Sequence, residues 1–237
     1  MQLPADDAVA RSMAEAIRTG DVEAVRQLLT QQPEVASARI IGRRGGARTV
    51  LHIAADWPGQ FPNAPEIVRM LVAAGADVNA DTGGSAPETP LHWAASSDDV
   101  DVAGVLIDLG ANLETPGGSI GTPLDNAIGY GCWAVAHLLV RRGARVDRLW
   151  HAAALGLLGR VEELLSEVPV PGAAEINQAF WHACSGAQQR TAAHLLARGA
   201  DINFVPSYNN ATPLGAATAV PTRRGTLAAW LREHGAQ

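Results

Sequence analysis

Side chains that could take part in acid–base chemistry recur at one position of a repeated segment. The best copy of this segment, which we call the head, reads TPLHWAA and begins at Thr89. A histidine or an aspartate in a groove that excludes water could act as a general acid or base, and a tryptophan could bind a flat or apolar ligand. The position that follows the leucine or phenylalanine of each head is occupied, in chain order, by His52, His92, Asp125, Trp150 and Trp181.

The heads, and the glycines between them, predict the elements that position these side chains. Threonine is a good N-cap, and proline at the next position has no amide to leave unpaired, so a short helix should start at each head. Glycine permits the left-handed residue that ends a second helix. Each unit is therefore a helix, a turn, a second helix and an extended loop, and the units must stack because none can bury its apolar face alone. Threonine heads begin at Thr49, Thr89, Thr122 and Thr212, and Gly-Ala tails begin at Gly75, Gly110, Gly143 and Gly199.

This pattern, with a period of about 33 residues, resembles the ankyrin repeat family. The resemblance implies an all-α fold, an ankyrin-repeat solenoid of about seven helix-turn-helix units. The fifth and sixth units should be irregular, because Leu149 follows Leu124 too closely for a full loop and the unit around Trp181 lacks Thr-Pro. Every strong period is helical, so we expect no β-sheet beyond short hairpin loops. We expect a single ankyrin-repeat domain over residues 1–237, with an N-terminal cap unit at 1–48, internal repeats at 49–204 and a C-terminal cap unit at 205–237.

The resemblance also implies where a partner would bind. Ankyrin proteins bind partners on a concave face, which is formed by the loops and the exposed side of each first helix. By resemblance, the exposed positions directly follow the alanine pair of the head, and the variable head position lies one turn earlier on the same helical face. The predicted binding residues are Trp57, His92, Ser96, Ser97, Asp125, Tyr130, Trp150, His151, Leu155 and Trp181.

Several of these residues have a structural interpretation beside the functional one. His52 and His92 match the histidine with which the family braces its loops. Trp150 and Trp181 could fill the space of a missing loop, or they could form an aromatic wall together with Trp57 and Tyr130. Trp93 lies one place further along the head, where its counterpart is Ile53, so it is expected in the core.

Composition narrows the possible functions. The net charge of -6 argues against general nucleic-acid binding, which depends on a surplus of basic side chains. Two cysteines are too few for a disulfide framework, and no apolar run approaches a membrane span or a signal peptide, so we expect a cytoplasmic monomer that does not associate with membranes. No metal-binding or cofactor-binding motif is present, so we expect the protein to use neither a metal ion nor a cofactor. All 18 basic residues are arginine, which suggests a GC-rich bacterial source such as an actinomycete.

Two functions are compatible with these residues. The first is a non-catalytic recognition protein that binds another protein through the concave face. The alternative is an ankyrin-fold enzyme or small-molecule binder that accepts an apolar or aromatic compound, such as a cyclase acting on a polyketide-like substrate in actinomycete natural-product biosynthesis. In that alternative, His52, Asp56 and Tyr130 would be the catalytic acid–base groups of an aromatic groove.

Overall fold

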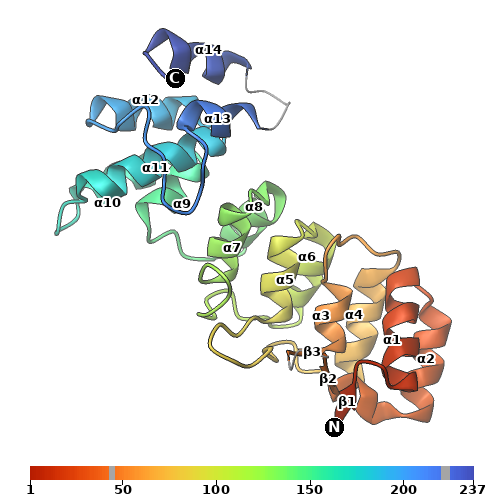
Figure 1. Ribbon diagram of the computed structural model, residues 1–237. Helices are drawn as coiled ribbons and strands as arrows, with labels where there is room; N and C mark the ends of the chain where they lie inside the picture. The colour runs from red at the N-terminus through yellow and green to blue at the C-terminus, as the bar shows by residue number, and fades with distance from the viewer. Residues whose placement is uncertain (43–45, 220–224) are drawn as a thin grey trace. The chain divides into compact units, whose positions relative to one another are not determined.

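The computed structural model describes residues 1–42, 46–219 and 225–237 (Figure 1). The chain forms two compact units, residues 1–144 and 145–237. Both units are built from antiparallel helix pairs joined by turns and loops, so the predicted all-α fold of the ankyrin-repeat class is confirmed. The assignment of residues 1–48 and 205–237 as cap units stays a prediction.

The helices of the first unit pair in chain order. Asp7, Asp21 and Asp99 cap α1, α2 and α6 by accepting hydrogen bonds from the free amides of the first turn. Thr49, Thr89 and Thr122 are the N-cap residues of α3, α5 and α7, as the heads predict. The pairs are α1 (Ala8–Thr19) with α2 (Val22–Gln31), α3 (Val50–Ala54) with α4 (Ala64–Ala73), α5 (Pro90–Ser96) with α6 (Val100–Asp108), and α7 (Pro123–Gly129) with α8 (Trp133–Arg141), and the short helix η1 (Pro33–Ser37) follows α2.

A small sheet in the first unit corrects one expectation. Strand β2 (Arg39–Ile41) forms the expected hairpin with β3 (Ala47–Thr49), but β1 (Gln2–Pro4) also pairs with β2 in parallel. The sheet therefore has three strands instead of the two of a hairpin loop. Its pairing satisfies backbone groups of the N-terminal segment, and it places Leu3 opposite the buried Ile40.

The second unit has its own apolar core. Phe180 is fully buried among Leu149, Val161, Leu195 and Leu231, all of which belong to this unit. Its helices are α9 (Leu149–Ala154), α10 (Leu158–Ser166), α11 (Ala173–Ser185), α12 (Gln189–Ala197), α13 (Pro213–Thr218) and α14 (Gly225–Glu233).

The loops before α9 and α11 are short, and for α9 the spacing of the heads predicts this. Residues 142–148 connect α8 to α9 and residues 167–172 connect α10 to α11, whereas residues 109–122 connect α6 to α7. The first helix α11 is also longer than α5 or α7. The irregular fifth and sixth units thus differ from the others in their loops and in the length of a first helix.

Candidate functional site

The two head histidines have the same hydrogen bonds in consecutive repeats. His52 Nδ1 accepts from the Thr49 amide at 3.1 Å, and its Nε2 donates to the Glu88 carbonyl oxygen at 2.9 Å. His92 repeats both contacts with the Thr89 amide and the Gly121 carbonyl, each at 3.1 Å. Burial lowers the pKa of His52 to about 4 and also lowers the pKa of His92, because a buried ring disfavours its charged form. Both rings are therefore neutral at pH 7 and tie one repeat to the loop of the next.

Asp125 occupies the same head position in the third copy but makes different contacts. Its carboxylate Oδ2 accepts from the Thr122 amide at 2.6 Å and from the Thr122 hydroxyl at 2.9 Å. The side chain is fully buried, and it packs so closely on Gly121 that a side chain there would collide with the carboxylate. Asp125 thus holds the start of α7 from inside the repeat.

Trp181 fills the role that a histidine fills in the regular repeats. Its indole Nε1 donates to the Ala211 carbonyl oxygen at 2.9 Å. Ala211 precedes Thr212, just as Glu88 precedes Thr89 and Gly121 precedes Thr122. Only 6% of Trp181 is exposed. The contact favours the interpretation of Trp181 as a brace over its interpretation as part of an aromatic wall.

Five predicted residues of the first unit come together around one cavity of about 230 Å³. This cavity, which we call the first-unit hollow, receives side chains from the end of α3, from α5, from the end of α7 and from the loops beside them. Its lining residues are Asp56, Trp57, Glu88, Trp93, Ser96, Ser97, Ser119 and Tyr130. Of these, Asp56, Trp57, Ser96, Ser97 and Tyr130 were predicted from the sequence.

The buried amide of Asn126 organises one side of the hollow. Its Nδ2 donates to Glu88 Oε1 at 3.1 Å and to Ser96 Oγ at 3.3 Å, and its Oδ1 accepts from the Ile120 amide at 3.2 Å. Glu88 Oε1 also accepts from the Ser119 amide at 2.9 Å. Sequence reasoning missed Glu88, Ser119 and Asn126. The one available signal was the polar Asn126 at the head position where Ile53 and Trp93 stand in other copies.

Two aromatic side chains stand exposed at the hollow. Trp57 is 78% exposed and Tyr130 is 55% exposed, although both are large rings. The loop of Trp57 is fixed by the Gly59 amide, which donates to the Asp56 carbonyl at 2.8 Å, and by the Gln60 amide, which donates to Asp99 Oδ2 at 2.6 Å. The Tyr130 hydroxyl donates to Ser119 Oγ at 2.9 Å. The loop backbone that carries Trp57 and the hydroxyl of Tyr130 are thus held in place on a surface that solvent reaches.

Trp93 corrects the expectation that it belongs to the core. Its counterpart Ile53 is fully buried, but Trp93 is only partly buried and lines the hollow. Its ring meets His52 edge to face, with centroids 5.0 Å apart. An indole is too large for the space that holds isoleucine, so part of it extends to the surface.

Asp56 brings the hollow into contact with two arginines. Its Oδ2 lies 3.6 Å from Arg18 Nη2 and 3.5 Å from Arg48 Nη1. All three side chains are partly exposed, so these pairs are screened by water and contribute little to stability. Asp56 is therefore oriented by opposite charges, which an approaching ligand could replace.

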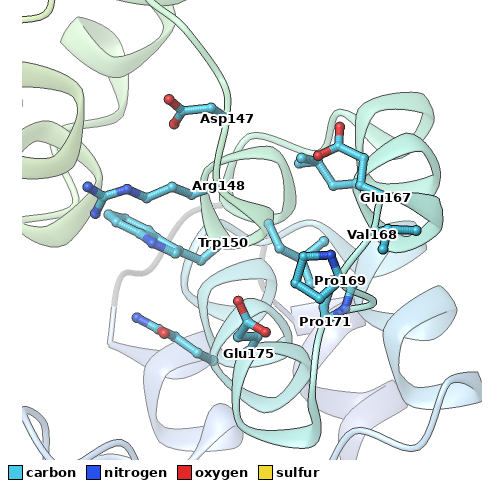
Figure 2. A pocket seen from close by; sticks show the side chains of 11 residues that line it. Asp147, Arg148, Trp150, Glu167, Val168, Pro169, Pro171 and Glu175 are labelled. Carbon is cyan, nitrogen blue, oxygen red and sulfur yellow. The ribbon is translucent and has the colours of Figure 1, made fainter.

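A second cavity, of about 370 Å³, lies in the second unit. Figure 2 shows Arg148 and Trp150 on one side of it and Glu167, Val168 and Pro169 on the other. Trp150 packs against His182 with centroids 4.7 Å apart and the ring planes tilted by 33°, so its ring is partly engaged in packing. The remaining predicted residues of this unit, His151, Leu155 and Trp181, are buried and do not line this cavity.

Two further properties concern ligands and membranes. Among the described residues, no three histidine, cysteine or acidic side chains are grouped so that they could hold a metal ion. In the same part of the chain, no helix combines the length and the apolar character needed to cross a bilayer.

Comparison with known proteins shows a similarity over part of the chain. The family model described as ankyrin repeats (3 copies) matches residues 63–148. Residues 63–148 are thus similar to ankyrin repeats. Among solved structures, the ankyrin repeat domain of human ASB11 is similar, with 24% sequence identity, coverage of 80% of this chain and 85% of that chain, and a TM-score of 0.46. The comparison with curated proteins gives no match. The matched segment includes all of the first-unit hollow except Asp56 and Trp57.

Proposed function

We propose that this protein is a recognition protein that binds a protein partner through the loop and first-helix face of its first unit, with the first-unit hollow at the centre. The observation that carries the proposal is the exposure of Trp57 and Tyr130 on a braced rim. Tryptophan and tyrosine are over-represented among the residues that dominate the affinity of protein interfaces. Ankyrin repeats in residues 63–148 agree with a role as a protein-interaction module.

The size and openness of the hollow favour a protein partner over a small molecule. Cavities that bind small molecules usually measure about 300–1,000 Å³ and enclose most of the ligand. The hollow measures about 230 Å³, and Trp57 at its edge is mostly in contact with solvent. Such a cavity suits one side chain that projects from a larger ligand.

The positions of the three predicted catalytic residues give little support to the enzyme alternative. His52 is fully buried, both ring nitrogens are engaged, and its pKa is lowered to about 4. Asp56 and Tyr130 do line the hollow and keep this alternative testable. An enzyme that uses the Tyr130 hydroxyl as an acid or base would lose about 100-fold in turnover on Tyr130→Phe, whereas a binding protein would lose at most about 1.5 kcal/mol of affinity.

We further propose that the protein works as a monomer in the cytoplasm of a bacterium. Cys132 and Cys184 are both buried free thiols, which agrees with a reducing compartment.

Site-specific photo-crosslinking in the cells that make the protein tests the proposed function. A photoreactive phenylalanine replaces Trp57 at the hollow or, as the matched control, Arg69, which is exposed on α4. We expect a covalent adduct with one protein from position 57 and none from position 69. Equal adducts from both positions, or none from position 57, would contradict the proposal. Once the partner is identified by mass spectrometry, Trp57→Ala should weaken its binding by about 2 kcal/mol or more.

A further inference from the structure

We propose that the first-unit hollow takes a basic side chain, an arginine or a lysine, from a positively charged segment of the partner. This inference rests on the proposed function and adds the chemistry of the ligand. It is carried by the acidic and aromatic residues that line the hollow.

The charges around the hollow favour a cation. Its lining among the described residues includes the carboxylates of Asp56 and Glu88 and no arginine. Arg48 lines a neighbouring cavity that shares Glu88 and Trp93 with the hollow. Both hydrogen bonds described for Glu88 go to Oε1, one from Asn126 and one from Ser119, so Oε2 is the oxygen that a ligand could use. A guanidinium or an ammonium group would form a charge-assisted hydrogen bond there.

The aromatic rings of the hollow also favour a basic side chain. Trp57, Trp93 and Tyr130 contribute three aromatic side chains to one small cavity. The face of an aromatic ring attracts a cation, and tryptophan does so most strongly. Arginine and lysine also carry an apolar stem, which can pack against the rings while the charged end reaches Glu88. A cavity of about 230 Å³ is suited to one such side chain.

Charge is distributed unevenly between the two units. Residues 1–144 hold 17 acidic side chains and 10 arginines, whereas residues 145–237 hold 7 acidic side chains and 8 arginines. The first unit therefore carries the whole negative excess of the chain. Such a field attracts a basic segment and repels an acidic one before contact.

The arginines beside Asp56 do not fill the hollow themselves. Arg18 and Arg48 approach Asp56 at 3.6 and 3.5 Å, which is long for a charged hydrogen bond, and their side chains are 42% and 34% exposed. They leave Glu88 without a described ion pair. Glu88 is therefore the carboxylate on which the inference chiefly depends.

Nuclear magnetic resonance of the six indole N–H groups of the intact protein gives a direct test. The probe is arginine amide, and the matched control is citrulline amide, which has nearly the same shape without the charge of the guanidinium group. We expect arginine amide to shift the Trp57 and Trp93 signals in a saturable way, and citrulline amide to leave them unchanged at the same ionic strength. The Trp150 signal reports on the cavity of the second unit and should stay constant.

Variants make the test specific to the hollow. Glu88→Gln keeps an acceptor for Asn126 and Ser119, so it should fold, and it should weaken arginine amide binding about three- to fivefold. Glu66→Gln removes the same charge from an exposed position on α4 and should bind like the wild type.

Other outcomes would overturn the inference. The inference is wrong if citrulline amide shifts the Trp57 and Trp93 signals as much as arginine amide does, or if N-acetylglutamate amide shifts them instead. It is also wrong if arginine amide shifts only the Trp150 signal or no signal at all. Equal binding of arginine amide by the two glutamine variants would likewise contradict it. If crosslinking places a partner at position 57 while arginine amide gives no selective shift, the proposed function stands and only the basic ligand is wrong.

Discussion

His52, His92 and Trp181 each donate a ring N–H to the carbonyl oxygen of the residue before the head threonine of the following copy. The two histidines also hold their own head threonine through Nδ1. An imidazole can do both only while neutral, because a protonated ring has no acceptor nitrogen. Stability should therefore depend on pH through the histidines, whereas the indole of Trp181 performs the same bracing at any pH.

The pH dependence of stability tests the histidine brace. The pKa of His52 falls from 6.5 to about 4 on folding, so between these pH values the unfolded chain binds more protons than the folded one. The contribution of His52 is full above pH 6.5, and this contribution should fall by about 1.4 kcal/mol per pH unit as the pH drops from 6 toward 4. The lowered pKa values of His92 and His182 add to the slope of the whole protein. Urea unfolding of the wild type and of His52→Gln measures this slope, which the substitution should reduce. The control variant His137→Gln, at an exposed position on α8, should keep the wild-type dependence of stability on pH. If His52→Gln also keeps the wild-type dependence, the proposed role of His52 as a brace is wrong.

The indole bond of Trp181 can be isolated by comparing two equivalent substitutions. Trp181→Phe removes the N–H that bonds to Ala211 and should lower the free energy of unfolding by about 0.5–1.5 kcal/mol beyond the loss of ring size. Trp93→Phe is the matched control, since Trp93 Nε1 is buried with no hydrogen-bond partner among the described residues. Chemical denaturation followed by circular dichroism measures both. Equal losses for the two variants would mean that the bond to Ala211 contributes nothing.

At the scale of elements, the first helices approach each other through small side chains. Ala54 and Ala55 on or just after α3, and Ala94 and Ala95 on α5, are fully buried. Polar ties at the turns connect one helix pair to the next, since Asp98 Oδ1 accepts from the Val135 amide at 2.9 Å. The hollow depends on this stacking, because its lining residues come from successive pairs.

Enlarging a buried alanine should separate the stacked helices. Ala95→Leu should lower the free energy of unfolding by about 1–3 kcal/mol, because a fully buried site has no room for three more carbon atoms. Ala134→Leu makes the same change at an exposed position of α8 and should change stability by less than about 0.5 kcal/mol. Thermal unfolding of both variants checks the prediction. An unaltered melting temperature for Ala95→Leu would show that the helices meet elsewhere.

At the scale of the whole molecule, each compact unit has a core of its own. Leu51, Leu91 and Leu106 are fully buried in the first unit, and the cluster around Phe180 lies wholly in the second. In stacked repeats, stability is approximately the sum of local terms, so neither core requires residues from a distant repeat.

The two units should therefore fold as separate fragments. We expect residues 1–144 and residues 145–237, expressed alone, to give helical circular dichroism spectra and cooperative unfolding. All residues of the hollow lie in the first fragment, so that fragment should also keep the response of Trp57 to arginine amide. A fragment that stays unfolded while the intact chain folds would contradict the independence of its core.

The sequence by itself determined the local features of this protein. Thr89 and Thr122 precede α5 and α7, Gly75 and Gly110 follow α4 and α6 with positive φ, and His52 and His92 brace their loops. These features depend on caps, turns and helical periods within a few residues, so the residue types alone predict them. The same patterns predicted that Asp56, Trp57, Ser96, Ser97 and Tyr130 share one exposed face.

Only the tertiary structure decided which side chains meet across repeats. Glu88 and Asn126 are 38 positions apart and meet at the hollow, and Trp181 finds its acceptor 30 positions away. The parallel pairing of β1 with β2 and the partial exposure of Trp93 likewise follow from contacts between distant segments. The physical reason is that a helical period fixes the direction of a side chain within its own repeat, whereas the spacing and packing of neighbouring repeats decide what that side chain contacts.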